Sequence, residues 1–403
     1  MANAILTPSM ITNASLDVIE NNLSFTKGVN RAYDDQFAID GAKIGDTLNI
    51  RKPAKYIGRT GATLAIEDHT ETSVPLVLDT QFGVDVTFTS KDLTLSLGDF
   101  KSRVLKPAGA RIANRIDELG LLMAYQSTYN AVGTPGTIPA TLRTYLQAGA
   151  KMDYEGTPRD GDRSVVIDPS AQVEIVDALK GLFQSSSEIK DQYENGNMGL
   201  AGGFKWSMDQ NIFVHTVGAQ GGAPLVNGAG QTGSSLITNG WTAAAAPRLA
   251  KGDVFTIAGV FAVNPQSRLS TGQLRQFVVT TAVSSDVGGN ATISISPAIV
   301  LTGSLQNVTV LPAAGAAITV LGAAGLASPQ HIAYHKNAFT LGCADLVIPK
   351  GVDMAARASD KQLGISVRMV RQYAIGTDTL PCRFDVLFGW KALYPEFACR
   401  IVG

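Results

Sequence analysis

A glycine-rich stretch gives the nearest match to a ligand-binding motif in this sequence. Gly228, Gly230 and Gly233 fit the pattern G-x-G-x-x-G, and Asp253 lies near the spacing at which an acid would hold a ribose hydroxyl. A dinucleotide site needs a strand before the glycines and a helix after them, so that the helix N-terminus faces the pyrophosphate. Residues 234–247 show no helical apolar period. The stretch therefore predicts a flexible loop and no cofactor.

Two histidines have the spacing of a metal-binding pair. His331 and His335 are four residues apart, which on a helix would place both imidazoles on one face. Zinc hydrolase chemistry would need a glutamate beside the first histidine and a third ligand, whereas Gln330 and Ile332 flank His331. We therefore expect packing roles for these histidines and no metal site.

Carboxylates and thiols show no catalytic arrangement either. Asp160 and Asp162 flank a glycine and are expected to lie in a turn. The sequence has no G-x-S-x-G elbow and no P-loop. The three cysteines are too far apart for a zinc site or a disulfide framework, and we expect buried thiols at Cys343, Cys382 and Cys399. The sequence therefore predicts that this protein is not an enzyme.

Composition narrows the class of protein further. Of the 403 residues only 17% are charged, and 33 basic residues against 34 acidic ones give a formal net charge of -1. Such a balance does not favour wrapping of nucleic acid or binding to anionic lipid. The N-terminus lacks the pattern of a secretory signal, and the uncharged stretch 287–330 is interrupted by proline and glycine. We expect synthesis in the cytoplasm and no membrane span.

The N-terminal third combines one helix with long strands. Leu16, Ile19 and Leu23 recur at helical spacing within residues 6–25, which predicts an amphipathic helix or arm. From residue 46 the apolar period changes to two, which predicts antiparallel strands up to residue 89. Residues 51–72 between them are polar on both sides and predict a projecting loop, which carries Lys52, Lys55, Arg59, Glu67 and Asp68.

A long helix and a mixed section follow. Apolar residues from Phe100 to Met123 step by three or four, with Ser96 or Asp99 as a cap and Pro107 as a kink or break. Further helices are predicted at 142–152 and 171–183, around a strand at 164–168, and the section ends in a glycine-rich loop at 195–203.

Charge density falls sharply over residues 218–327, which predicts a separate inserted domain. Its short alternating patterns predict the strands of a small barrel or sandwich, at 254–257, 277–283, 292–296 and 308–311. The mixed pattern then resumes, with strands expected within 339–348, 363–372 and 384–388. The simplest account is an insertion within one discontinuous α+β domain.

Several stretches resemble one known architecture. VPLVL at 74–78, VDVTFT at 84–89 and the helix around 111–118 are similar to the spine-helix region of the Hong Kong-type major capsid proteins of tailed bacteriophages. HKNAFTL at 335–341 and FDVLFGW at 384–390 resemble the later segments of that family. KGDVFTIAGV at 251–260 and ISPAI at 295–299 resemble the extra β-barrel of the short-tailed-phage coat proteins.

The resemblance implies a division of the chain and a function. The implied regions are an N-terminal arm (1–40), an extended β loop and β-hinge (41–95), the spine helix with the first part of the peripheral and axial domains (96–217), an inserted β-barrel (218–327) and the second part of those domains (328–403). The implied function is self-assembly into the hexamers and pentamers of an icosahedral head that encloses double-stranded DNA. The alternative is a subunit of a phage tail, fibre or adhesin.

The resemblance also implies partners and contacts. The expected partners are further copies of the chain, a scaffolding protein, a portal, a decoration protein and packaged DNA bound without specificity. Assembly is expected in the host cytoplasm. No catalytic acid for a lysine–asparagine cross-link is recognised. We expect the loop residues Lys52, Lys55, Arg59, Glu67 and Asp68 to contact a neighbouring subunit, and Asp17 and Glu20 to contact the scaffold.

Overall fold

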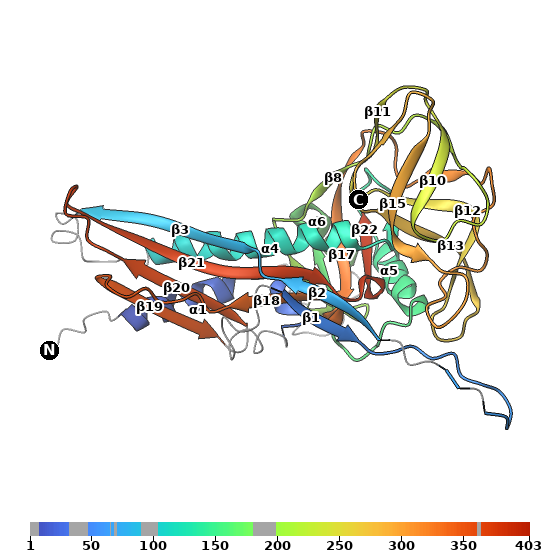
Figure 1. The fold of residues 1–403 in the computed structure, drawn as a ribbon. Coiled ribbons are helices and arrows are strands. Elements are labelled where there is room, and N and C mark those ends of the chain that lie inside the picture. Colours follow the sequence, from blue (N-terminus) through green and yellow to red (C-terminus); the bar gives the residue numbers. More distant parts are fainter. Residues whose placement is uncertain are drawn as a thin grey trace. The chain divides into compact units, whose positions relative to one another are not determined.

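The computed structural model describes residues 8–31, 47–64, 66–67, 71–89, 104–179, 199–360 and 364–403. These residues form few helices and many strands, which confirms the predicted mixed α+β class (Figure 1). The chain divides into two compact units, each built from segments far apart in the sequence. Unit 1 comprises Met1–Ile50, Ser73–Gly120 and Phe339–Lys391, and unit 2 comprises Arg51–Thr72, Leu121–Ala338 and Ala392–Gly403.

Unit 1 contains two sheets and helices beside them. A two-stranded sheet is formed by β1 (Thr47–Lys52) and β2 (Thr72–Val77). The larger sheet has the order β18-β21-β20-β19, with β3 also paired to β21. Its strands are β3 (Thr80–Thr89), β18 (Phe339–Ala344), β19 (Met354–Asp360), β20 (Ile365–Arg371) and β21 (Thr379–Ala392).

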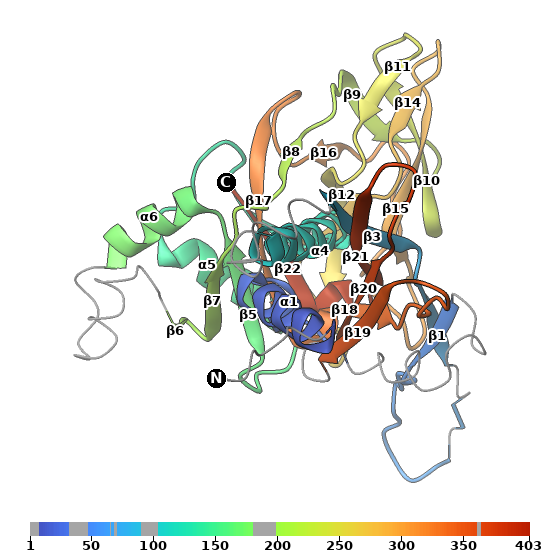
Figure 2. The same cartoon turned by 90° about the vertical axis from the view of Figure 1, so that its left-hand side faces the viewer.

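The N-terminal helix packs inside unit 1. α1 (Pro8–Asn22) buries Leu16 and Ile19, and Leu23, the third residue whose spacing predicted the helix, is buried directly after its end. It contacts β19 and β20 on one side and the start of α4 (Lys106–Ser127) on another (Figure 2). Gly109 of α4 permits this approach, since a Cβ there would lie 3.0 Å from Cγ1 of Val18. The predicted amphipathic arm is therefore a docked helix.

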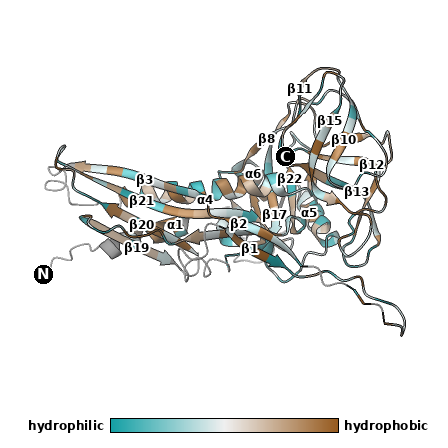
Figure 3. Ribbon diagram, in the orientation of Figure 1, coloured by the Kyte–Doolittle hydropathy of each residue, from teal (hydrophilic) through white to brown (hydrophobic). Residues whose placement is uncertain are grey.

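Pro107 lies in the first turn of α4. A proline is tolerated there because the first N–H groups of a helix have no intrahelical acceptor. Figure 3 shows hydrophilic and hydrophobic positions along this helix, as its sequence period requires. The expected caps, Ser96 and Asp99, lie outside the described residues, as does Phe100.

Unit 2 contains a seven-stranded sheet with helices beside it. The strand order is β4-β22-β17-β5-β7-β6, and β8 pairs with β17. A core cluster joins α5 (Leu142–Tyr154) and α6 (Pro169–Leu179) to the sheet through residues such as Tyr145, Ile175 and Phe204. The strands are β4 (Ala131–Gly133), β5 (Arg163–Ile167), β6 (Leu200–Ala201), β7 (Phe204–Met208), β8 (Val214–Thr216), β17 (Ala327–His335) and β22 (Ala398–Val402).

The low-charge stretch forms its own sheets and core within unit 2. A six-stranded sheet has the order β16-β12-β13-β15-β10-β9, and β11 pairs with β14. Its buried cluster includes Leu236, Phe255, Phe277 and Ile293. The strands are β9 (Gly222–Val226), β10 (Gly233–Trp241), β11 (Ala246–Leu249), β12 (Val254–Val263), β13 (Ser270–Val279), β14 (Val283–Ser285), β15 (Ala291–Ile299) and β16 (Ile318–Val320).

Two details of the predicted strand pattern are wrong. Residues 308–311 form no strand, because Val308 makes only an isolated bridge to Ala262, and β16 takes the place beside β12. The pattern at 277–283 is divided between the end of β13 and the start of β14. Short 3-10 turns are also present, at Lys336–Ala338, Pro395–Phe397 and Thr26–Gly28. None of the described helices is long and apolar enough to cross a membrane.

Candidate assembly surfaces

The base of the 51–72 loop is fixed to its own subunit. The Lys52 ammonium lies 4.8 Å from the centroid of the Tyr394 ring, and Lys55 Nζ lies 3.8 Å from Oε1 of Glu396. Burial lowers the pKa of Lys52, and the nearby Glu396 opposes that shift. These two lysines thus make contacts within the subunit, and their contact with a neighbour stays a prediction.

The far part of the loop is closed by its own hydrogen bonds. The Glu67 carboxylate accepts the N–H groups of Ile57 at 2.7 Å and Gly58 at 2.6 Å. Arg59 Nη1 donates to the carbonyl of Gly61. Glu67 and Arg59 therefore shape the loop, while Asp68 lies outside the described residues.

The same loop displays large apolar side chains to solvent. Leu64 is 75% exposed and Ile66 is 86% exposed, and Tyr56 and Ile57 are also exposed. Clustered exposed apolar residues mark protein contact surfaces when their backbone is ordered by other contacts. The loop tip, defined as residues 56–67, is thus apolar as well as charged.

Arg268, in the low-charge stretch 218–327, contacts this loop. Its Nη2 donates to the carbonyl of Tyr56 at 3.4 Å, and its Nη1 donates to the carbonyl of Gly303 at 3.1 Å. Arg268 has φ 61, a left-handed conformation that is costly for a residue with a Cβ. The loop is therefore supported from two sides, by the 394–396 segment and by the low-charge stretch.

The two acids expected to meet a scaffold lie on α1. Asp17 is exposed, whereas Glu20 is half-buried and lies one helical turn after buried Leu16. Their role in scaffold binding stays a prediction.

Asp117 holds the segment that follows α1, a role that no sequence pattern predicted. This α4 carboxylate is buried and accepts the N–H groups of Ser24 at 2.6 Å, Phe25 at 3.3 Å and Thr26 at 3.0 Å. The Thr26 hydroxyl also donates to it. The bonds join residues about 90 positions apart, so only the tertiary structure could reveal them.

A second buried acid organises the unit 1 sheet. Asp385 of β21 accepts from Arg368 Nη2 at 2.7 Å and from Arg383 Nη2 at 2.9 Å. Gly83 faces it across the β3–β21 pair, and a Cβ at Gly83 would lie 2.5 Å from Asp385 Oδ1. The small residue on one strand therefore makes room for the carboxylate on the other.

A buried ion pair joins the low-charge stretch, residues 218–327, to the rest of unit 2. Arg275 Nη1 of β13 lies 2.5 Å from Oε1 of Glu155, at the end of α5, and its guanidinium stacks on the Tyr129 ring at 4.6 Å. Burial raises the pKa of Glu155, and Arg275 opposes this. Beside them the Gln276 amide pairs with both the N–H and the C=O of Ala131, each at 2.9 Å. Removing one partner of such a buried pair leaves an unpaired charge.

Asp253 holds the start of the low-charge stretch. The carboxylate accepts the N–H groups of Gly218 at 3.1 Å and Ala250 at 2.7 Å, and it lies 2.8 Å from His215 Nε2. His215 is therefore a buried partner of this acid rather than an isolated histidine. The acid that a dinucleotide motif would have assigned to a ribose is used to hold the backbone.

The glycine motif and the remaining histidines have structural roles as well. Residues 227–232 connect β9 to β10 in an antiparallel hairpin, so a strand and not a helix follows the glycines. His331 accepts the N–H of Asp168 at 3.2 Å, and His335 Nε2 lies 3.1 Å from Asp160. Among the described residues no three His, Cys, Asp or Glu side chains gather as metal ligands.

The prediction that the three cysteine thiols are buried is confirmed. Cys343, Cys382 and Cys399 are free and buried. Burial raises the pKa of Cys382 to about 11 and that of Cys399 to about 12, so both thiols stay protonated at neutral pH.

Comparison with known families decides what the chain is. The family model described as P22 coat protein, gene protein 5, matches residues 3–403. The chain belongs to the P22 coat protein family. It is accordingly a major capsid protein that forms a phage shell and is located in the virion, and the tail, fibre or adhesin alternative is not favoured. Membership of a P22 coat protein family points to a structural role rather than an enzymatic one.

Similar solved structures come from other phages. A chain of Mycobacterium phage Che8 has 12% sequence identity and a TM-score of 0.45, over 94% of this chain and 90% of that one. The capsid of Ralstonia phage GP4 has 8% identity and a TM-score of 0.49, over 95% and 90%. The CUS-3 coat protein I-domain has 28% identity and a TM-score of 0.20, over 26% of this P22-family chain and 100% of that chain. Curated proteins gave no match to the sequence.

Proposed function

We propose that this coat protein assembles as hexamers and pentamers of an icosahedral head around double-stranded DNA. The observation that carries the proposal is the family match over residues 3–403. The ordered loop tip with exposed Leu64 and Ile66 supports it, because such a surface is suited to contact with another copy. The nearly neutral chain also allows many copies to pack without strong mutual repulsion.

We propose further that the fold is the Hong Kong type with an inserted β-barrel. Long α4 beside the β3–β21 pair supports the spine-helix assignment of residues 96–217. The separate core that includes Phe255 and Phe277 supports the insert at 218–327. On this proposal residues 1–40 are the arm, 41–95 the extended loop and hinge, and 328–403 the second part of the peripheral and axial domains.

The proposed contacts follow from the two candidate surfaces. The loop tip, which includes Arg59 and Glu67, contacts a neighbouring subunit together with Asp68, while Lys52 and Lys55 hold the base of the loop and extend the contact. Asp17 and Glu20 of α1 meet a scaffolding protein with a basic surface. A portal and a decoration protein are the other proposed partners, DNA is contacted without sequence specificity, and assembly takes place in the host cytoplasm.

Co-expression with a scaffolding protein tests the proposed function. Negative-stain electron microscopy should show closed or aberrant icosahedral shells. A soluble monomer or dimer over a wide concentration range, with the scaffold present, would overturn the proposal.

The loop contact has its own test. Replacing both Leu64 and Ile66 by Ser should reduce shell yield severalfold and leave thermal unfolding of the subunit unchanged, because both side chains are exposed. Val347→Ser, at another exposed apolar residue, is the matched control. Normal shells from the Leu64/Ile66 variant would contradict the loop contact.

A further inference from the structure

A recess of about 390 Å³ lies in unit 2. One wall is α5, with Leu146 and Ala150, and another is the β6–β7 hairpin, with Leu200 and Phe204. The remaining wall is the turn before β5. Exposed Leu146 and Leu200 at its edge make the recess partly apolar.

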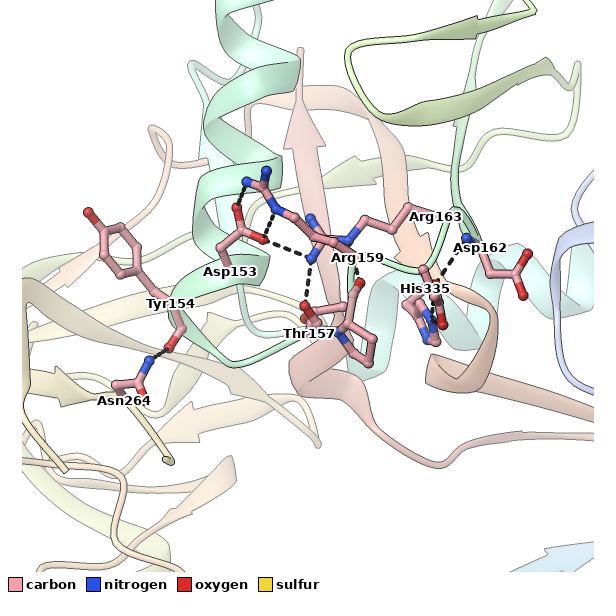
Figure 4. Close-up of polar contacts among 10 residues, drawn as sticks. Asp153, Tyr154, Thr157, Arg159, Asp162, Arg163, Asn264 and His335 are labelled. Carbon is pink, nitrogen blue, oxygen red and sulfur yellow. Dashed lines mark hydrogen bonds and ion pairs between the residues drawn. The ribbon is translucent and has the colours of Figure 1, made fainter. Parts of the chain in front are cut away.

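Two guanidinium groups share one carboxylate in this recess. Asp153 accepts from Arg159 Nε at 2.9 Å and from Arg163 Nη2 at 2.8 Å, and it pairs with Arg159 Nη2 as well (Figure 4). All three residues line the recess. Two positive charges against one negative charge leave an excess of one positive charge.

The guanidinium groups are held in place before any ligand arrives. Arg163, with a side chain only 6% exposed, also donates to the carbonyls of Pro158 at 2.9 Å and Thr157 at 2.6 Å. Arg159 is 74% exposed but is fixed by two bonds to Asp153. Among the described residues no hydrogen bond engages Nη1 of Arg159, so this donor is available at the open side of the recess.

Such a recess suits an acidic side chain beside an aliphatic one. A carboxylate matches the planar guanidinium donors, and the aliphatic neighbour matches the apolar wall. A shell of identical subunits offers one abundant source of such a pair, which is another copy of the chain.

The α6 helix displays a pair of this chemistry. Val173 is 69% exposed, and the adjacent Glu174 is exposed as well. No hydrogen bond or ion pair within the described parts of the chain engages the Glu174 carboxylate. By contrast, Glu67 beside exposed Ile66 is bonded to its own loop, and Asp286 beside exposed Val287 is bonded to its own turn.

We propose that Val173 and Glu174 of one coat subunit dock into the Arg159–Arg163 recess of the adjacent copy. The contact is heterologous, since it joins different surfaces of two identical subunits, and repeated contacts of this kind close into a ring. This inference rests on the proposed hexamers and pentamers. In each ring the contact is one of those that join neighbouring subunits.

A charge exchange tests the pairing. Glu174→Arg and Arg159→Glu should each lower shell yield at least tenfold under scaffold co-expression, and the double variant should restore at least half of the parent yield. Arg143→Glu is the matched control, because Arg143 is exposed on α5 and does not line the recess. It should assemble as the parent does.

The outcomes separate this inference from the proposed function. If the parent chain forms no shells, the proposed function fails. If the parent assembles and Glu174→Arg does too, the docking inference alone is overturned. It is also overturned if both single variants fail and the double variant fails with them, because the acid in the recess then comes from elsewhere.

A second measurement guards against a folding defect in Arg159→Glu, which places a carboxylate beside Asp153. A chain carrying both Arg159→Cys and Glu174→Cys should give cross-linked oligomers when its shells are treated with a bismaleimide long enough to replace an arginine–glutamate pair, which a disulfide is too short to span, and the ladder on a denaturing gel should end at five or six subunits. Monomers alone on that gel would overturn the inference.

Discussion

Replacing Asp117 with asparagine should release the segment that joins α1 to the rest of unit 1. The amide is nearly the same size as the carboxylate, but it has one acceptor oxygen and no charge. Three backbone N–H groups and one hydroxyl, from residues 24–26, donate to the carboxylate. The amide nitrogen would face some of these donors, so at least two of the bonds should be lost.

The size of the effect follows from those bonds. A hydrogen bond to a charged group contributes about 1.5–3 kcal/mol to stability. Loss of two therefore predicts destabilisation by about 3–6 kcal/mol, because Asp117 is buried and water cannot replace the acceptor at once. This is a large part of the stability of a typical domain.

Trp390 provides the assay. Its ring centroid lies 5.5 Å from that of Phe25, and its Nε1 donates to the carbonyl of Ile116 at 3.1 Å, so its fluorescence should report on this segment. Urea unfolding followed by that fluorescence, with amide hydrogen exchange at residues 24–26, should show the loss. The matched control is Glu118→Gln, which removes a half-buried pair with Arg115 on the same helix and should cost under about 1 kcal/mol. Equal unfolding midpoints and equal exchange in the two variants would refute the reasoning.

Three further predictions concern other parts of the chain. Gly120→Ala should destabilise unit 1 by about 1–3 kcal/mol, measured by urea unfolding, because the new Cβ would lie 2.7 Å from the Trp390 ring; a gain in stability from helix propensity would contradict this. Burial lowers the pKa of His331 from 6.5 to about 4, so the folded state favours the neutral ring. The free energy of unfolding should therefore be highest above pH 6.5 and should fall by up to about 3 kcal/mol as the pH drops toward 4. His331→Phe should lose less stability over that pH range, and parallel titration curves for the two proteins would disprove the assignment. Residues 218–327 expressed alone should unfold cooperatively with a dispersed amide spectrum, since they hold their own core; a non-cooperative product would show dependence on the host strands.

Periodicity predicted the elements in which large apolar residues recur at the spacing of a helix or a strand. Leu16, Ile19 and Leu23 located α1, and alternating apolar residues located β3 and β21. β10 was missed because its buried positions include Thr238 as well as Leu236, and because a bulge near Trp241 breaks the alternation. A pattern in hydropathy cannot register a buried threonine that is satisfied by a distant carbonyl.

The polar contacts that organise the molecule could not be predicted in the same way. Asp117, Asp253 and Asp385 look like ordinary surface acids in the sequence, and their partners are set by tertiary contacts. The loop was easier to find, because a run of charges without apolar period has no core to cover. Its apolar tip was overlooked because those charges surround Leu64 and Ile66 in the sequence.

The stem of the insert has a consequence for how such subunits can diversify. β8 and the start of β17 pair antiparallel, with Thr216 opposite Ala327 and Val214 opposite Pro329, and Val217 N–H donates to the carbonyl of Leu326 at 3.0 Å. The two chain ends of the insert are therefore clamped together by host strands before the insert begins. The β8–β17 pairing fixes the strand register and the distance between the two chain ends. The residues between these ends can therefore change in length or be replaced, because the host strands keep the ends together and the loop-closure entropy of the host is unchanged. A lineage of shells could thus exchange this module for an unrelated one, and an engineer could graft a foreign domain onto the same pair of strands.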